Sequence, residues 1–387
     1  MLAAVAGGNL QGVEAAYLAQ KAGWDVLVID RKPMVPASGL CHTFSQLDMT
    51  SENDLAHALN GVDLVIPALE NDAALASLER VTRNSGIPFA FDSAAYAISS
   101  SKVKSEKLFK QIGAPTPASW PGCRFPVVVK PDKGSGSRDV KIFHDITELL
   151  EHLKPPAPEW LVQEFISGPS YSLEVIGTPG RYTTPQVTDL FMDAQYDCKR
   201  VIAPSNLSQA LISEFEALSL TLAGSINLNG IMDVEVILHE GELKVIEIDA
   251  RLPSQTPTTV FWSTGLNMVQ LLGDIFLTRQ ARIQPDSSQE HGVIYEHVRV
   301  ASSHLEITGE HIMSGADGLQ VCPDFFGADE AITNYAAGRD AWVATLIVVA
   351  ENIEPAWQKR NSVIADIRKT LNLEIYRDPV PHPRNIV

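Results

Sequence analysis

Residues 230–256 place an unusual number of carboxylates at alternating positions. β-Forming residues dominate residues 231–238 and 243–250, which predicts a β-hairpin. Alternate residues of a strand share one face of a sheet, so the charged side chains of each strand point the same way. That face carries Asp233 and Glu235 on the first strand, and Glu247, Asp249 and Arg251 on the second.

The loop between the strands decides whether these two sets of acids meet. A two-residue turn would pair Glu235 with Ile246, which puts the acids on opposite faces. A three-residue loop over residues 240–242 instead pairs Glu235 with Glu247. We expect the three-residue loop, because the other face is then wholly apolar and a slip by one residue would destroy that pattern. The apolar face would consist of Met232, Val234, Val236, Leu238, Ile246, Ile248 and Ala250.

Carboxylates that face one another repel, and a cation among them relieves the repulsion. Ligands that are all oxygen atoms favour Mg²⁺ over Zn²⁺. Arg251, at the end of the acidic row, adds a fixed positive charge that could hold a phosphoryl group or a developing oxyanion. The alternative is a solvated polar face of an edge hairpin, which antiparallel sheets often have.

The hairpin resembles the metal-binding hairpin of ATP-grasp ligases, which has an acid on one strand and Glu-x-Asn-x-Arg on the next. Glu235, Glu247 and Arg251 match this pattern, and Asp249 stands where asparagine is usual. The resemblance implies ATP and two Mg²⁺ ions, which Glu235, Glu247 and Asp249 would bind. It also implies that Arg251 and Lys130 are catalytic.

The resemblance further implies the fold class, which is α/β. We expect an ATP-grasp fold, in which two α+β lobes clamp ATP, preceded by an open Rossmann-like α/β domain. The N-terminal domain is placed at residues 1–100, the small lobe at 101–175, and the large lobe with the metal hairpin and the C-terminal part at 176–387.

The N-terminal domain begins with a predicted strand, a glycine loop and a helix from Val13, followed by a strand that ends at Asp30. This order also occurs in dinucleotide-dependent oxidoreductases, but Gly7, Gly8 and Gly12 do not have the G-x-G-x-x-G spacing. The glycines still allow an anion to approach the helix N-terminus. By the resemblance, the candidate substrate contacts here are Leu10, Gln11 and Asp72.

Several segments match the nucleotide site of the family. Strand 125–130 ends at Lys130, and residues 132–138 form a Gly/Ser loop that could fold over phosphates. Residues 160–166 match the hinge that binds adenine and ribose. The residues assigned to ATP are Lys104, Lys130, Ser135, Gly136, Ser137, Gln163, Glu164, Phe165, Ile166 and Glu174.

Ser254, Gln255 and Thr256 follow the metal acids and are assigned to an amino-acid substrate. Asp233 or Asp72 would hold an ammonium group. The net charge of −17 agrees with cationic substrates and argues against nucleic acid or an anionic membrane as a partner. The chain has four scattered cysteines and no long apolar run, so we expect a reduced, cytoplasmic protein without a membrane span. A homodimer is compatible with the sequence.

These motifs predict a carboxylate–amine ligase. ATP would phosphorylate a substrate carboxylate, and an amine would attack the acyl phosphate to give an amide, ADP and phosphate. Within the fold, the alternatives are a D-alanine-type or a carboxylase-type ligase. Outside it, the alternatives are the oxidoreductase and a nucleotide-binding protein without catalytic activity.

Overall fold

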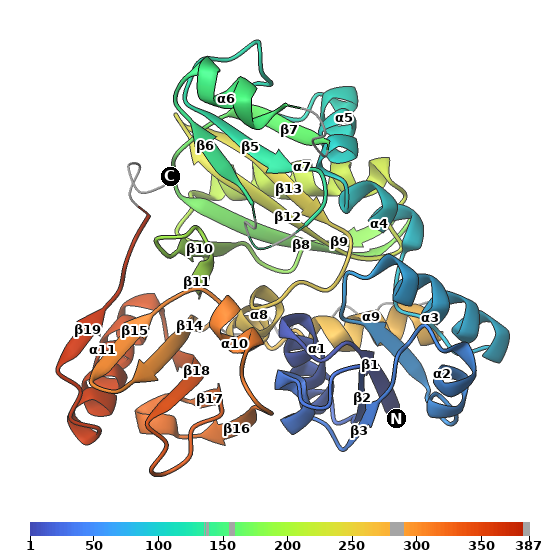
Figure 1. Ribbon diagram of the computed structural model, residues 1–387, viewed down its shortest axis with the longest axis vertical. Coiled ribbons are helices and arrows are strands. Elements are labelled where there is room, and N and C mark those ends of the chain that lie inside the picture. Colours follow the sequence, from blue (N-terminus) through green and yellow to red (C-terminus); the bar gives the residue numbers. More distant parts are fainter. Residues whose placement is uncertain (135, 137–138, 155–158, 279–289, 382–387) are drawn as a thin grey trace.

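Three β-sheets organise the chain in the computed structural model, which describes residues 1–134, 136, 139–154, 159–278 and 290–381 (Figure 1). The first sheet belongs to the N-terminal domain. A small three-stranded sheet covers the nucleotide side, and a twelve-stranded sheet forms the rest of the molecule.

The N-terminal sheet is parallel and has the strand order β3-β2-β1-β4. Its strands are apolar on both faces because helices cover both: α1 packs with Val5 and Val28, whereas α2 and α3 pack with Ala4 and Leu27. The elements are β1 (Leu2–Ala6), α1 (Leu10–Lys21), β2 (Asp25–Asp30), β3 (Thr43–Gln46), α2 (Glu52–Ala58), β4 (Leu64–Pro67) and α3 (Asp72–Ser85).

The first helix begins earlier than the sequence predicted, at Leu10 instead of Val13. Gly12 therefore lies inside the helix and not in the loop. A Cβ atom at Gly12 would lie 2.2 Å from the backbone oxygen of Gly7, so only glycine permits this close approach.

The small lobe has the strand order β6-β5-β7, and all its pairs are antiparallel. Its helix α5 begins at the N-cap Ser101, whose side chain accepts a hydrogen bond from the Lys104 amide. The elements of this part are α4 (Ser93–Ser99), α5 (Lys102–Ile112), β5 (Val127–Pro131), β6 (Lys141–Phe143), α6 (Ile146–His152) and β7 (Trp160–Glu164).

The large sheet runs without a break from the metal hairpin to the C-terminal part, in the order β13-β12-β8-β10-β11-β14-β18-β17-β16. Strand β8 belongs to this sheet, so the domain limit predicted after residue 175 falls inside β8. The strands are β8 (Ser170–Thr178), β9 (Arg181–Thr183), β10 (Thr188–Met192), β11 (Cys198–Ala203), β12 (Gly230–His239), β13 (Glu242–Asp249), β14 (Gly292–Ala301), β15 (His304–Ile307), β16 (Gln320–Pro323), β17 (Glu330–Thr333), β18 (Ala341–Ala350) and β19 (Ile375–Arg377).

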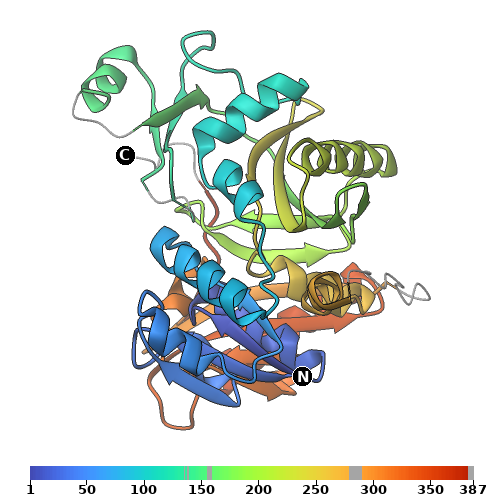
Figure 2. The ribbon, with the colours of Figure 1, turned by 90° about the vertical axis from the view of Figure 1, so that its right-hand side faces the viewer.

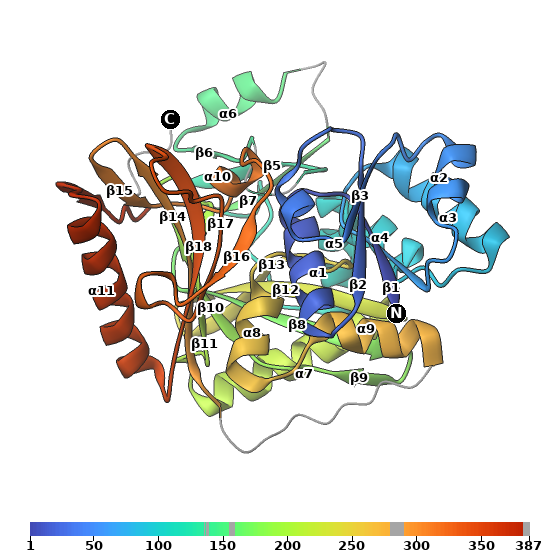
Figure 3. The ribbon, with the colours of Figure 1, turned by 90° about the horizontal axis from the view of Figure 1, so that it is seen from below.

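Helices cover this sheet and join it to the N-terminal domain. Seen from below, α9 lies against α1, β4, β8 and β12, between the N-terminal domain and the large sheet (Figure 3). The view in Figure 2 has the small lobe above and the N-terminal domain below. The helices are α7 (Gln209–Ser225), α8 (Thr256–Thr264), α9 (Met268–Thr278), α10 (His311–Ser314) and α11 (Ile353–Thr370).

Among the described residues, no single helix is long and apolar enough to cross a membrane. Helices α8 and α9, which meet at a bend of 97°, are together long and apolar enough to do so by length and composition alone. Both helices are largely buried in the protein.

Candidate active site

The two strands of the metal hairpin bring their acids face to face, as predicted. Asp233 lies opposite Asp249, and Glu235 lies opposite Glu247. The predicted three-residue loop, however, is wrong. His239 pairs with Glu242, so the turn contains only two residues.

A β-bulge reconciles the short turn with the acid pairing. Val236 lies opposite Val245 while Glu235 lies opposite Glu247, so Ile246 is the extra residue of β13. The two turn residues, Glu240 and Gly241, have positive φ values of 52° and 86°, as such a turn requires.

The bulge also changes the apolar face. Ile246 was predicted to lie in the core, but it is only partly buried and its carbonyl oxygen lies 3.5 Å from the Lys130 Nζ atom. The inserted residue shifts the alternation of β13 by one position. The core side chains are therefore Leu243, Val245 and Ile248 of β13, and Ala250 directly after it.

Burial and crowding strongly perturb the acids of the hairpin. Burial is the main cause that raises the pKa of Asp249 to about 7, with Glu247 adding to the effect and Arg251 opposing it. Burial likewise raises the pKa of Asp233 to about 6. The pKa of Glu235 is raised well above its ordinary value by burial and by Asp233 and Glu247. A cation between these groups would stabilise their ionised forms.

Two protein cations contact this acidic row. Lys102 Nζ lies 2.8 Å from Glu247 Oε1, and Arg251 Nη2 lies 2.7 Å from Asp249 Oδ2. The other Asp249 oxygen, Oδ1, is buried without a hydrogen-bond partner. An oxygen-only donor set with an orphaned buried carboxylate oxygen fits Mg²⁺.

A cavity of about 1090 Å³ lies between the small lobe and the large sheet. Lys130 and the hinge residues Gln163, Glu164, Phe165 and Ile166, all assigned to ATP from the sequence, line this one cavity.

Hydrogen bonds fix the hinge side chains in this cavity. Gln163 is buried and donates to Glu106 over 2.7 Å, and its own Oε1 has no partner. Glu164 accepts a hydrogen bond from the Ala118 amide over 2.8 Å. Burial lowers the pKa of Lys130, and Lys102 also acts in this direction, whereas Glu247 and Glu235 oppose it.

Three of the described residues assigned to ATP lie outside this cavity: Lys104, Glu174 and Gly136. Lys104 points away from the cavity and donates to the Ala97 carbonyl over 2.9 Å. Lys102 lines the cavity instead, because residues two apart on a helix face nearly opposite directions. Glu174 also lies outside the cavity lining: it is fully buried on β8 opposite Asp233 and accepts a hydrogen bond from Thr256.

The glycine loop is described only in part. Ser135 and Ser137 lie outside the described residues. Gly134 lines the large cavity, and its carbonyl accepts a hydrogen bond from Lys102 over 2.6 Å. Gly136 lines a second, smaller cavity.

This second cavity, of about 500 Å³, lies between the hairpin and the N-terminal domain. Six of the seven predicted substrate contacts line it, together with the metal acids and Arg251. Those six are Leu10, Gln11, Asp233, Ser254, Gln255 and Thr256. The two cavities share Glu235 and Glu247 in their walls.

Asp72 is the seventh predicted contact, and it lies outside the cavity. It is the first residue of α3, it is exposed, and it forms an ion pair with Lys133 over 2.8 Å. Glu70 lines the cavity instead and contacts both Arg251, over 2.7 Å, and Gln11, over 3.2 Å. The chain turns into the helix after Glu70, which directs Asp72 to solvent.

The charged cavity residues that were not assigned from the sequence include Lys102, Glu70, Asp197 and Glu310. Lys102 and Glu70 lie two residues from the assigned Lys104 and Asp72, so the correct segments were identified with the wrong side chains. Asp197 and Glu310 also line the smaller cavity. Neither belongs to a motif, and only the folded chain brings them to the site.

The wall shared by the cavities defines what the site can do. A nucleotide in the larger cavity and a small polar molecule in the smaller one would meet at Glu235 and Glu247. Lys102, Lys130 and Arg251 supply positive charge beside these acids. This arrangement suits phosphoryl transfer from the nucleotide to the bound molecule.

Comparison with known proteins agrees with this geometry. Residues 99–255 match the model of the ATP-grasp domain family. The chain is 39% identical over 310 residues to the 3-methyl-D-ornithine–L-lysine ligase of Methanosarcina mazei, an alignment that covers 80% of this chain and 81% of the relative. The ligase of the same name from Methanosarcina acetivorans is 39% identical over 311 residues, covering 80% and 82% of the two chains.

Solved structures share the fold over nearly the whole chain. An N5-carboxyaminoimidazole ribonucleotide synthetase in complex with ADP has a TM-score of 0.70 at 16% identity, covering 95% of this chain and 97% of its own. The biotin carboxylase domain of the Hydrogenobacter thermophilus 2-oxoglutarate carboxylase has a TM-score of 0.72 at 16% identity, covering 94% and 89%. The chain therefore belongs to the ATP-grasp family and, within it, to the 3-methyl-D-ornithine–L-lysine ligases.

Proposed function

We propose that this enzyme joins the carboxyl group of 3-methyl-D-ornithine to the ε-amine of L-lysine, with release of ADP and phosphate, in pyrrolysine biosynthesis. The observation that carries the proposal is the wall of Glu235 and Glu247 between a nucleotide-sized cavity and a smaller polar one. The relatives of known name supply the identity of the two amino acids.

The larger cavity would hold ATP. The backbone and side chains of Gln163 to Ile166 would surround adenine and ribose, and Lys130 and Lys102 would contact the phosphates. The loop residues Ser135, Gly136 and Ser137 would cover the phosphates. In this proposal Lys102 takes the role first assigned to Lys104.

Glu235, Glu247 and Asp249 would hold Mg²⁺, and we propose two ions. Bound Mg²⁺ supplies positive charge that neutralises the phosphate oxygens. Lys102 already contacts Glu247, so this lysine is placed to move from the carboxylate to a phosphate when the acids receive their metal.

The smaller cavity would hold the amino acids. Arg251 is held between Asp249 and Glu70, and it would stabilise negative charge on the substrate carboxylate as the acyl phosphate forms and reacts. Asp233 would bind an ammonium group. The amides at the N-terminus of α1, near Leu10 and Gln11, would bind a carboxylate.

We propose a cytoplasmic location, since the four cysteines are all free thiols. We further propose a homodimer, because the biotin carboxylase domain of similar fold is described as a dimer. Size-exclusion chromatography with light scattering would test the oligomeric state.

The function is tested by ADP release with the amino acids alone and in pairs. We expect ADP and an amide product only when both L-lysine and 3-methyl-D-ornithine, or its analogue D-ornithine, are present. Mass spectrometry would identify the amide, and Nα-acetyl-lysine would distinguish attack by the ε-amine from attack by the α-amine. Faster ADP release with D-alanine or bicarbonate would contradict the proposal.

A further inference from the structure

The two amino acids of the proposed reaction carry more amino groups than one acid can hold. Lysine keeps its α-amino group when its ε-amine reacts, and ornithine keeps both its α- and δ-amino groups. Three ammonium groups therefore need partners in the smaller cavity. Asp233 provides one anionic partner on β12, so further acceptors are needed on other elements.

Glu310 is an acid of this cavity that the mechanism above does not use. It is half-buried immediately before α10, and it lines the cavity together with Ser254 and Gln255. Burial raises the pKa of Glu310 to about 7. The charge of Asp197 also raises this pKa, whereas the polar side chains of Ser254 and Gln255 lower it. A bound cation would offset this destabilisation of the ionised carboxylate.

Gln255 provides an independent sign of a missing ligand. Its side chain lines the cavity and is 5% exposed, and its Oε1 atom has no hydrogen-bond partner. Glu310 lines the same cavity, so the free Gln255 oxygen and the Glu310 carboxylate are two acceptors in one cavity. Such a pair lacks a donor, and an ammonium group has three.

The backbone holds Gln255 in this orientation. It has φ 73° and ψ −58°, and the Thr256 amide donates to the Ser254 carbonyl over 2.9 Å, which defines a γ-turn with positive φ. Glu14, fully buried on α1, accepts a hydrogen bond from the Thr258 amide over 2.6 Å and another from the Gln255 amide. A rare backbone conformation held by a buried acid is typical of a functional site.

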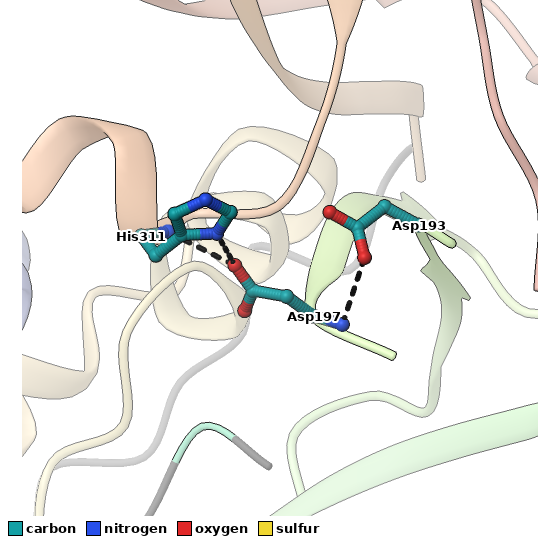
Figure 4. A group of neighbouring side chains, drawn as sticks. All are labelled: Asp193, Asp197 and His311. Carbon is teal, nitrogen blue, oxygen red and sulfur yellow. Dashed lines mark hydrogen bonds and ion pairs between the residues drawn. The ribbon is translucent and has the colours of Figure 1, made fainter. Parts of the chain in front are cut away.

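Backbone hydrogen bonds also hold the segment that carries Glu310, and Figure 4 shows the one between His311 and Asp197. The Gly309 amide donates to Asp193 over 2.9 Å, the Glu310 amide to the Cys198 carbonyl over 3.1 Å, and the His311 amide to Asp197 over 3.0 Å. Asp193, Asp197 and His311 lie close enough to suggest a metal site. The carboxylates of Asp193 and Asp197 already accept hydrogen bonds from backbone amides, so we assign these two residues to positioning Glu310.

We propose that Glu310 and Gln255 form an ammonium-binding subsite, which holds a non-reacting amino group of one of the two amino-acid substrates. The inference rests on the proposed function for the identity of the substrates. The recognised chemistry is a primary ammonium group.

The test is equilibrium binding of L-lysine and D-ornithine, measured by calorimetry without ATP, to the wild type and to Glu310→Gln. We expect the dissociation constant of one of them to rise at least about tenfold, because a charged hydrogen bond is lost. Ser254→Ala should weaken binding of the same amino acid by about threefold, since it removes a polar side chain that favours the ionised form of Glu310. Binding of an ATP analogue should not change in either variant.

The matched control is Glu306→Gln, the same substitution four residues earlier. Glu306 pairs with Arg299 over 2.5 Å and does not line the cavity. This variant should bind both amino acids as the wild type does. If Glu310→Gln and Ser254→Ala also bind both as the wild type does, the inference is wrong.

Analogues that lack one amine would identify the group that is held. They are 6-aminohexanoate for lysine, and 5-aminopentanoate and D-norvaline for ornithine. The analogue that lacks the amino group held by Glu310 should bind the wild type and Glu310→Gln equally. If Glu310→Gln binds all three analogues more weakly than the wild type does, the inference is wrong. If the wild type binds L-lysine and D-ornithine but forms no amide from them, only the proposed function is wrong. If the wild type binds neither amino acid, the subsite is wrong.

Discussion

The two cavities of this enzyme are built in different ways. The cavity proposed for the nucleotide draws on the small lobe, the hairpin, parts of residues 189–200 and the C-terminal residues 378–381, and apolar side chains such as Val128, Ile142 and Ile166 line much of it. The substrate cavity draws on the N-terminal domain, the hairpin, the loop before α8 and the segment before α10. Its lining is rich in acids.

This difference reflects two tasks, which are binding of a nucleotide common to the family and recognition of one particular substrate. A nucleotide offers the same adenine and phosphates to every member of a family, so short local motifs suffice to bind it. A substrate with several ammonium groups needs acids at separate points in space. Glu235 and Glu247 lie in the walls of both cavities, so these acids must serve the nucleotide and the substrate together.

The largest effect is expected at this wall. Glu247→Gln and Asp249→Ala each remove a proposed Mg²⁺ ligand, so ADP release should fall by roughly a hundredfold or more. Coupled ADP assays would measure the loss, and circular dichroism would establish that the variants are folded. Normal turnover in either variant would show that these acids do not bind the metal.

The nucleotide side is tested by two lysines of one helix. Lys102→Met should raise the KM for ATP by about tenfold, because Lys102 faces the nucleotide cavity beside Glu247. Lys104→Met is the matched control and should leave this KM within about twofold, because the Lys104 side chain donates to the Ala97 carbonyl outside the cavity. A larger rise in the KM for ATP in Lys104→Met than in Lys102→Met would favour Lys104 as the nucleotide contact, as assigned from the sequence.

The substrate side is tested by two aspartates. Asp233→Asn should raise the KM for one amino acid by about tenfold and leave the KM for ATP unchanged, because only a substrate contact is lost. Asp72→Asn should change neither value, since Asp72 is exposed and lies outside the cavity. Steady-state kinetics with each substrate varied in turn would measure both. If Asp233→Asn changes only the KM for ATP, the assignment of Asp233 to the amino-acid substrate is wrong.

The smallest effect concerns pH. Asp233 and Asp249 have raised pKa values of about 6 and about 7 when folded, so the folded protein binds more protons than the unfolded chain above about pH 4. Their contribution to the stability of the metal-free protein therefore falls as pH rises from about 4 to about 7.

Mg²⁺ should counter this loss, because it binds the ionised carboxylates. We expect Mg²⁺ to raise the melting temperature by a few degrees at pH 8 and by less at pH 6, measured by calorimetry at matched ionic strength. Asp249→Asn should reduce the difference between the two pH values. Equal shifts at both would argue against a metal site on these acids.

Local patterns in the sequence determined much of the nucleotide cavity. Alternation in residues 231–238 and 243–250 predicted strands with acids on one face, and the pairing of Glu235 with Glu247 followed from the need for an apolar opposite face. The hinge residues and Lys130 were assigned by their resemblance to the family, and they line the cavity. These features depend on contacts within short segments, where chain periodicity is informative.

Tertiary structure decided the rest, because the competing arrangements have the same local pattern. The turn at Glu240 and Gly241 and the bulge at Ile246 produce the same acid pairing as a longer loop would, and packing of Leu243 and Val245 in the core selects between them. Which lysine of α5 enters the cavity depends on how the helix docks. Glu310 and Gln255 come to one cavity through hydrogen bonds between segments far apart in the chain, and no spacing in the sequence encodes this arrangement.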